Sequence, residues 1–204
     1  KKRILIPQDT GRNAQAKYIY VTGGSTGSHF INSILYEILP KLVSDFVIIH
    51  QTGDSLKFRD FERLSHLQKT LPQDLQGKYI IRKFIFPDEI GDVFKKADLI
   101  ISRSGANVVF EIMAMQRMSL LIPLPHGQNE EQISNAKFLK DLGVSEFIRE
   151  DDVTPEKVLN LIQEMFRNQK KYQENMKKTR EFIVDNAAEK IADVVEESYG
   201  KKNG

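Results

Sequence analysis

The 204-residue sequence contains no cysteine. This absence excludes a disulfide framework, a zinc site with thiolate ligands and a thiol nucleophile. No apolar run approaches the roughly 20 residues that a transmembrane helix needs, and the sequence shows no signal peptide. These absences fit a cytosolic protein.

The sequence also lacks a strong charge excess. Lysine and arginine number 30 against 28 aspartate and glutamate residues, which gives a formal net charge of +2. A nucleic-acid-binding protein usually has a larger or more clustered basic excess, so we expect no nucleic-acid partner. The lysines that follow Gln169 are interpreted as a solvated helix face, with weak attraction to an anionic membrane or to another domain as the alternative.

Short apolar runs alternate with amphipathic segments along the chain, a pattern typical of successive βαβ units. The predicted strands cover residues 18–21, 46–50, 79–84, 99–101, 120–122 and 145–148. The predicted helices cover residues 28–43, 57–69, 88–96, 107–115, 130–142, 155–167 and 171–198. The strands are apolar throughout, which favours a parallel sheet covered on both faces. We therefore expect an α/β fold, a Rossmann-like parallel sheet with helices on both faces.

The domain organisation follows from the same pattern. Residues 1–16 have little pattern and are predicted to be a connector, whereas residues 17–168 form the α/β domain. Residues 169–204 are predicted to form a long C-terminal helix of the same domain. This helix packs either against its own sheet or against another domain. In such folds, ligands bind outside the carboxyl ends of the strands, so we expect the chemistry in the loops there.

A glycine-rich loop follows the first predicted strand. Residues 22–28 have the sequence Thr-Gly-Gly-Ser-Thr-Gly-Ser and lead into a predicted helix. The glycines allow a ligand to approach the backbone, and the N–H groups at the helix start favour a phosphate. The alternative is a tight turn without a ligand. The cofactor loop of short-chain dehydrogenases is excluded because its last glycine falls on His29, and no Gly-Lys-Ser/Thr of a P-loop follows.

A second candidate segment begins after the fourth predicted strand, at Ser102. Gly105 and Ala106 leave the start of the next helix open to a diphosphate or a ribose. Glu111 follows on this helix, and a carboxylate can accept hydrogen bonds from the two hydroxyls of a ribose. The alternative is that an acidic residue near a helix start is favoured by the helix dipole alone.

The third candidate segment comprises the fifth predicted strand, a loop stiffened by Pro123 and Pro125, and a polar helix start. The side-chain amide of Gln132 both donates and accepts hydrogen bonds, which suits the hydroxyls of a sugar. His126 in the loop is a candidate base. Without a partner placed beside it, His126 is more typical of a polar surface.

Together these segments resemble the MurG-type glycosyltransferase family in order and spacing over roughly residues 17–150. The shared motifs include Gly-Gly-Ser-x-Gly, His-Gln-x-Gly, Ser-Arg-x-Gly-Ala, Ile-Pro-x-Pro and Gln-x-x-Asn-Ala. They lie in residues 23–28 with Asn32, and in residues 50–53, 86–90, 97–99, 102–106, 111–114, 122–125 and 132–136.

The resemblance implies the C-terminal, donor-binding half of a GT-B glycosyltransferase. Such a half binds UDP-N-acetylglucosamine for an inverting transfer that forms lipid II from lipid I in peptidoglycan biosynthesis. The implied ligand-binding residues are Gly24, Ser25, Thr26 and Gly27 at the diphosphate, Ser104, Gly105, Ala106, Asn107 and Val108 at the phosphate and ribose, Glu111 at the ribose hydroxyls, Gln132 and Asn135 at the sugar, and Phe86 and Pro87 at the uracil.

Three residues depart from the family pattern. Ser28 replaces the usual alanine. Glu131 stands where histidine or glutamine is common, which affects the choice of sugar. Pro87 has no N–H group, so one expected backbone donor to the uracil is missing.

The resemblance also implies what this chain does not supply. MurG-type enzymes carry their acceptor site, catalytic base and membrane-docking patch in an N-terminal domain, which residues 1–16 cannot form. Because the chain begins with Lys1, we expect a fragment without a catalytic residue, a metal or a cofactor. The full-length protein is expected to bind the lipid-linked acceptor and to lie peripherally on the cytoplasmic face of the bacterial membrane. The alternatives are a non-catalytic subunit of a split transferase, or a related enzyme with another UDP-sugar or lipid acceptor.

Overall fold

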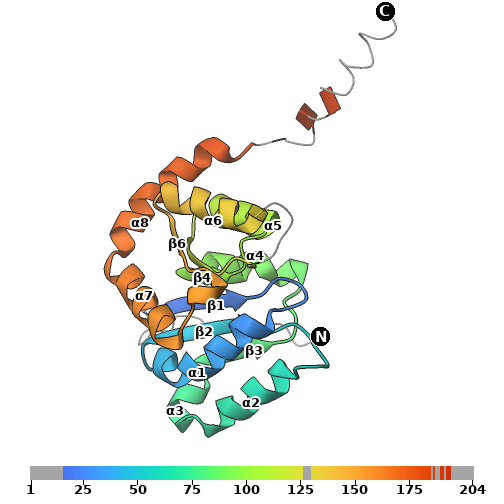
Figure 1. Cartoon of the computed structure of the whole chain (residues 1–204), viewed down its shortest axis with the longest axis vertical. Coiled ribbons are helices and arrows are strands. Elements are labelled where there is room, and N and C mark those ends of the chain that lie inside the picture. Colours follow the sequence, from blue (N-terminus) through green and yellow to red (C-terminus); the bar gives the residue numbers. More distant parts are fainter. Residues whose placement is uncertain (1–15, 126–129, 185, 187–188, 191, 194–204) are drawn as a thin grey trace, which may run out of the picture.

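A computed structural model of the chain describes residues 16–125, 130–184, 186, 189–190 and 192–193. Its centre is a six-stranded sheet in the order β3-β2-β1-β4-β5-β6, in which every neighbouring pair is parallel (Figure 1). The strands are β1 (Lys17–Thr22), β2 (Phe46–Gln51), β3 (Tyr79–Arg82), β4 (Leu99–Ser102), β5 (Met118–Leu121) and β6 (Ser145–Phe147). The predicted Rossmann-like parallel sheet is confirmed.

Helices cover both faces of the sheet, because each connection between parallel strands is a crossover. One face carries α1, α2 and α7, and the other carries α4, α5 and α6 (Figure 1). The helical segments are α1 (His29–Asp45), α2 (Asp60–Thr70), α3 (Gln73–Gln76), α4 (Pro87–Lys96), α5 (Ala106–Ala114), α6 (Glu131–Asp141), η2 (Glu150–Asp152), α7 (Pro155–Arg167), α8 (Gln169–Met176) and η3 (Lys177–Phe182).

The central strands are apolar because both of their faces are buried. Ile19 of β1, Ile48 of β2 and Ile100 of β4 are all fully buried. The predicted third strand ends earlier than expected, at Arg82, and the next residue, Lys83, pairs through its side chain with Asp54 at 2.6 Å. The short helix α3 was not predicted from the sequence.

The strand order reverses its direction at β1. The chain builds β2 and β3 on one side of β1 and then crosses over to β4 on the other side. A reversal of this kind separates the loops that follow β1 and β4, and ligands of such sheets bind in the crevice between them. The strand order therefore predicts ligand binding at the carboxyl end of β1.

The predicted single helix over residues 171–198 is wrong in its described part. The helix α8 ends at Met176, a 3₁₀ segment follows, and Ile183 is extended with φ −93°. The break coincides with a tertiary contact, since the buried Thr179 hydroxyl lies 2.7 Å from the carbonyl oxygen of Met176 and 3.2 Å from that of Met113 in α5. The connector 1–15 and residues 185, 187–188, 191 and 194–204 lie outside the described residues. Over the described ranges, no helix is long and apolar enough to cross a membrane.

A chain of buried polar side chains runs from the sheet core towards the loops at its carboxyl edge. His50 in β2 is fully buried, and its Nδ1 and Nε2 lie 2.8 Å and 2.9 Å from the Tyr79 hydroxyl and the Asn32 Oδ1. Asn32 in turn donates to the Thr52 carbonyl oxygen at 3.0 Å and to the Asp60 carboxylate at 2.9 Å. Because burial lowers the pKa of His50 to about 3, the imidazole is neutral, with its Nε2–H donating to Asn32 and its Nδ1 accepting from Tyr79.

We predict that His50 makes the protein less stable in mild acid. Between pH 6.5 and pH 3 the unfolded His50 binds a proton that the folded protein excludes. Lowering the pH from 7 to 5 should therefore cost the wild-type chain about 2 kcal/mol through this residue. Urea unfolding of wild type and His50→Gln at both pH values measures the difference, because the other histidines are common to both proteins. Equal pH dependence of the two proteins would contradict a neutral, buried His50.

Candidate ligand-binding site

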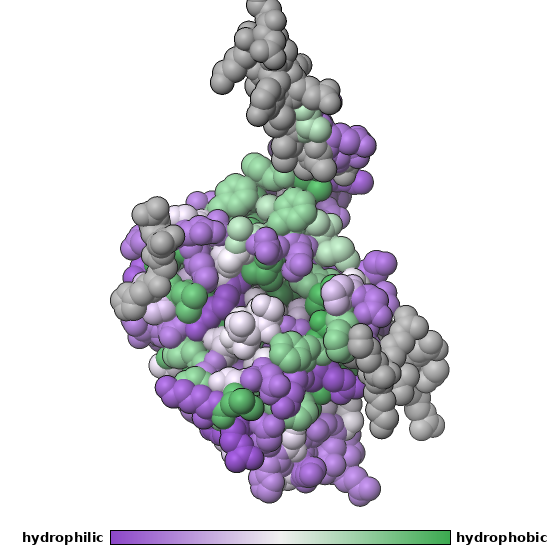
Figure 2. Space-filling model, turned by 90° about the vertical axis from the view of Figure 1, so that its right-hand side faces the viewer, coloured by the Kyte–Doolittle hydropathy of each residue, from purple (hydrophilic) through white to green (hydrophobic). Residues whose placement is uncertain are grey.

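The predicted site residues all lie at the carboxyl edge of the sheet. They occupy the loops after β1, β3 and β4, the first turn of α4 and the first two turns of α5 and α6. Figure 2 looks onto the side on which the loop after β1 emerges in Figure 1, and it shows a hollow near the middle of that face. The topology therefore brings these separate segments to one recessed edge.

The glycine-rich loop after β1 has a conformation that requires glycine. Gly24 and Gly27 have φ angles of +87° and +78°, and the Gly27 N–H donates to the Gly24 carbonyl oxygen at 3.1 Å. A Cβ atom at Gly27 would lie only 2.0 Å from the carbonyl oxygen of Thr52 in the neighbouring loop. The turn between them exposes Ser25 and Thr26 to solvent, so its backbone is open to a ligand.

The buried Gln51 at the end of β2 joins two loops of the site. Its Nε2 donates to the carbonyl oxygen of Gly24 at 3.0 Å, and its Oε1 accepts from the Ile85 N–H at 2.8 Å. One side chain thus fixes the glycine-rich loop relative to the loop after β3. Sequence reasoning noted Gln51 as part of a motif but assigned it no role.

Several backbone N–H groups at the start of α4 cannot donate to a ligand. The Ile85 N–H donates to Gln51, the Phe86 N–H donates to the Glu89 carboxylate at 3.5 Å, and Pro87 has no N–H. The N–H groups of Ile85 and Phe86 are therefore engaged within the protein, and the N–H of the exposed Asp88, in the first turn of α4, is the neighbouring donor that faces solvent. The Phe86 ring, which is 39% exposed, is the group that α4 presents to a ligand.

The start of α5 has no side-chain cap. Its N-cap is Gly105, which has no side chain to cap the first N–H groups, and Ala106 and Asn107 are exposed. Uncapped N–H groups at a helix start, together with the helix dipole, favour an anionic ligand. This geometry suits a phosphate beside the glycine-rich loop.

Glu111 lies further along the same helix. No acidic residue occupies the first turn of α5, so Glu111 is beyond the region in which the helix dipole favours a carboxylate. Partial desolvation raises the pKa of Glu111 above its usual range. The dipole therefore does not account for Glu111, whereas a hydroxyl-bearing ligand at the start of α5 would use its two oxygens as acceptors.

Gln132 in α6 is held by its oxygen. Its Oε1 accepts from the Leu124 N–H at 3.1 Å and the Ser104 N–H at 3.4 Å, so its two N–H donors form the end that can bind a ligand. The Ser104 hydroxyl donates to the Gln132 carbonyl oxygen at 2.7 Å, and Asn135 Nδ2 donates to the Ser104 carbonyl oxygen at 3.0 Å. These bonds tie α6 to the loop after β4.

Arg103 is a residue of the site that sequence reasoning missed. Its Nη2 donates to the Ser28 hydroxyl at 2.9 Å, and its Nη1 donates to the Ile122 carbonyl oxygen at 3.0 Å and the Pro123 carbonyl oxygen at 3.4 Å. Nη1 also pairs with the Glu150 carboxylate. Arg103 was quoted as part of a motif, but that motif alone could not show which partners it holds.

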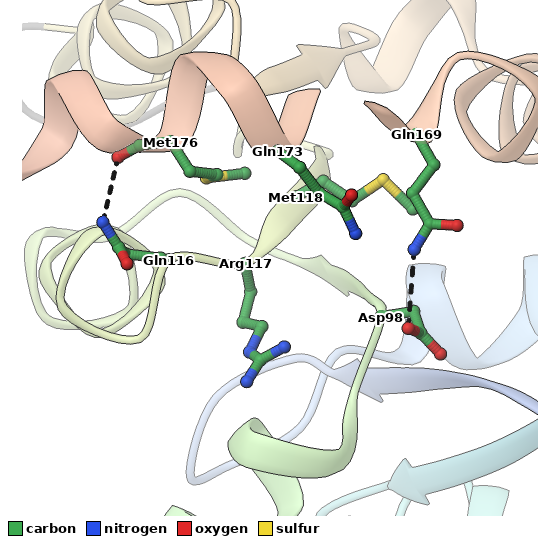
Figure 3. A pocket seen from close by; sticks show the side chains of 7 residues that line it. All are labelled: Asp98, Gln116, Arg117, Met118, Gln169, Gln173 and Met176. Atoms are coloured by element: carbon green, nitrogen blue, oxygen red, sulfur yellow. Dashed lines mark hydrogen bonds between the residues drawn. The ribbon is translucent and has the colours of Figure 1, made fainter. Parts of the chain in front are cut away.

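A separate pocket lies at the opposite edge of the sheet (Figure 3). Its volume is about 50 Å³, which holds one or two water molecules but no sugar nucleotide. The residues that line it are Asp98, Gln116, Arg117, Met118, Gln169, Gln173 and Met176. Among the residues that the structure describes, no group of three or more histidine, aspartate or glutamate side chains could hold a metal ion. The loop containing His126 lies outside the described residues.

Comparison with known proteins gives matches over most of the chain. Residues 18–195 match the glycosyltransferase family 28 C-terminal domain. The UDP-N-acetylglucosamine--N-acetylmuramyl-(pentapeptide) pyrophosphoryl-undecaprenol N-acetylglucosamine transferase of Clostridium perfringens (strain SM101 / Type A) is 31% identical over 183 residues, which are 89% of this chain and 47% of that protein. The enzyme of the same name from Clostridium novyi (strain NT) is 33% identical over 179 residues, 87% of this chain and 46% of that protein. The chain thus spans about half the length of these relatives.

A solved structure also matches most of the chain. The crystal structure of MurG from Acinetobacter baumannii superposes with a TM-score of 0.74 at 28% sequence identity. The match covers 90% of this chain and 50% of that protein.

We predict that Gly27→Ala destabilises the protein much more than Gly24→Ala. Both substitutions place a Cβ at positive φ, which costs about 1–2 kcal/mol. Only the Cβ at Gly27 meets a backbone carbonyl, since nothing lies within 4 Å of the Cβ position at Gly24. Overpacking of this kind adds about 1–3 kcal/mol. Urea unfolding of both variants measures the difference, and equal losses would show that the two loops do not pack as closely as described.

Proposed function

The chain belongs to the glycosyltransferase family 28 C-terminal domain family, and we propose that it binds UDP-N-acetylglucosamine as the donor half of an inverting glycosyltransferase. The transfer proposed for the whole protein forms lipid II from lipid I in peptidoglycan biosynthesis. The printed activity of the Clostridium perfringens and Clostridium novyi relatives supports this assignment.

The observation that carries the proposal is the open start of α5 followed by Glu111. A diphosphate would accept hydrogen bonds from the uncapped N–H groups behind Gly105, with the glycine-rich loop on its other side. Glu111 would then accept hydrogen bonds from the ribose hydroxyls. One helix could thus bind both parts of a nucleoside diphosphate, the anionic diphosphate and the diol of the ribose.

The remaining predicted residues have roles that fit the same ligand. The N–H donors of Gln132 would meet the sugar hydroxyls. The loop residues Ser25 and Thr26 would contact the diphosphate, and the Phe86 ring would cover the uracil. In this assignment Asn135 acts mainly by holding Ser104 in place. Residues 17–168 form the donor domain, and the chain after residue 169 belongs to the same domain.

The proposed chemistry is direct displacement of UDP by a hydroxyl of the lipid-linked acceptor. This domain would orient the donor and stabilise the charge that develops on the departing diphosphate through the start of α5. The acceptor site, the base and the peripheral membrane contact are assigned to the rest of the full-length protein. The exposed Glu131 favours one alternative, a related enzyme that uses another UDP-sugar.

We predict that Glu111→Ala weakens the binding of UDP-N-acetylglucosamine by about 10- to 100-fold. The reason is the net loss of about one hydrogen bond from a ribose hydroxyl to a charged acceptor, which is worth about 1.5–3 kcal/mol. Isothermal titration calorimetry of both proteins with UDP-N-acetylglucosamine, UDP-galactose and 2′,3′-dideoxy-UDP measures this effect. The dideoxy nucleotide should bind both proteins equally, because it lacks the hydroxyls that Glu111 accepts from.

Glu156→Ala is the matched control, because it removes an exposed glutamate in the first turn of α7, outside the segments that we assign to the ligand. It should leave all affinities unchanged. Wild-type chain that binds no UDP-N-acetylglucosamine at millimolar concentration would overturn the proposal. Tighter binding of UDP-galactose would establish the alternative donor.

A further inference from the structure

The guanidinium group of Arg103 lies between three loops of the site. It is only 11% exposed, and it stacks over the Phe30 ring at 5.7 Å. Its charge is matched by the Glu150 carboxylate, which is itself only 20% exposed. A guanidinium paired in this way is positioned to hold protein groups and has little free charge to offer a ligand.

One branch of Arg103 reaches the glycine-rich loop. Its Nη2 donates to the Ser28 hydroxyl at 2.9 Å, and the same hydroxyl accepts from the Ile31 N–H at 3.4 Å as the N-cap of α1. An alanine at this position could not accept from Arg103, so the link between the guanidinium and the glycine-rich loop depends on the Ser28 hydroxyl.

The other branch reaches the amide of Gln132. Nη1 of Arg103 donates to the Ile122 and Pro123 carbonyl oxygens, and the next N–H along the chain, that of Leu124, donates to Gln132 Oε1 at 3.1 Å. This places Arg103 two contacts away from the side chain that we assign to the sugar. A shift of the loop after β5 would break the hydrogen bond from Leu124 and leave the Gln132 amide free to rotate.

We propose that Arg103 is a positioning residue that couples the glycine-rich loop to the side-chain amide of Gln132, which we assign to the sugar. This inference rests on the proposed function. The two terminal nitrogens of the guanidinium hold Ser28 on one side and the backbone before Leu124 on the other. The coupling therefore depends on the forked geometry of the guanidinium and not on its charge. Selectivity for the sugar part of the donor therefore depends on a residue that does not touch the sugar.

The test compares affinity for UDP-N-acetylglucosamine with affinity for UDP, measured by calorimetry in wild type and variants. The ratio of the two dissociation constants reports the contribution of the sugar. Arg103→Lys keeps the charge but not the fork, so the ratio should fall to about one while UDP affinity changes by less than about 3-fold. Gln132→Ala should give the same fall, and the double variant should lose nothing further, because coupled residues act as one unit.

Two further variants keep the test decisive. Arg149→Lys makes the same change at an exposed neighbouring arginine and should leave the ratio at its wild-type value. Ser28→Ala removes one branch without altering Arg103, and it should lower the ratio even where Arg103→Lys fails to fold.

Three outcomes would overturn the inference. They are a wild-type ratio in Arg103→Lys, additive losses in the double variant, or a loss of UDP affinity as large as that of the sugar, which would mark Arg103 as a direct phosphate ligand. Wild-type chain that binds UDP but gains nothing from the sugar also overturns it while leaving nucleotide binding intact. Wild-type chain that binds neither compound overturns the proposed function and this assignment with it.

Discussion

The candidate site depends on the close backbone contact between the glycine-rich loop and the loop after β2. The Thr52 carbonyl oxygen packs against Gly27, and the Thr26 carbonyl oxygen packs against Gly53, where any Cβ atom would collide. The same Thr52 oxygen accepts a hydrogen bond from Asn32, which connects it through His50 to the core of the sheet. The conformation of the loop is therefore set before any ligand arrives, so little ordering entropy opposes binding.

The electrostatic arrangement follows from that constraint. Arg103, a cation beside these loops, is paired with Glu150, and the open start of α5 supplies uncapped N–H groups instead. A diphosphate held by N–H groups and a helix dipole needs no mobile side chain to neutralise it. The same fixed dipoles would stabilise the charge that develops as UDP departs, which is how a donor domain without a base contributes to catalysis.

The fold, and the gathering of the candidate residues at one edge of the sheet, were predictable because both depend on local patterns. Apolar runs such as 46–50 identify buried parallel strands, and polar residues after each strand identify the carboxyl edge. The end of α8 was not predictable, because it coincides with a contact between Thr179 and Met113, 66 residues earlier. The role of Arg103 was hidden for the same reason, since its partners Ser28 and Glu150 lie 75 and 47 residues away. Pro87 was identified from the sequence, but only the structure shows that the neighbouring Ile85 N–H is already used by Gln51.

The most direct test of the central claim is an NMR titration of the ¹⁵N-labelled chain with UDP-N-acetylglucosamine. If the donor binds at the carboxyl edge, the amide signals of residues 24–27 and 106–108 should shift in a saturable manner. The signals of Asp98 and Arg117, at the opposite edge, should stay in place. Shifts confined to that opposite edge, or no saturable shift at all, would contradict the account.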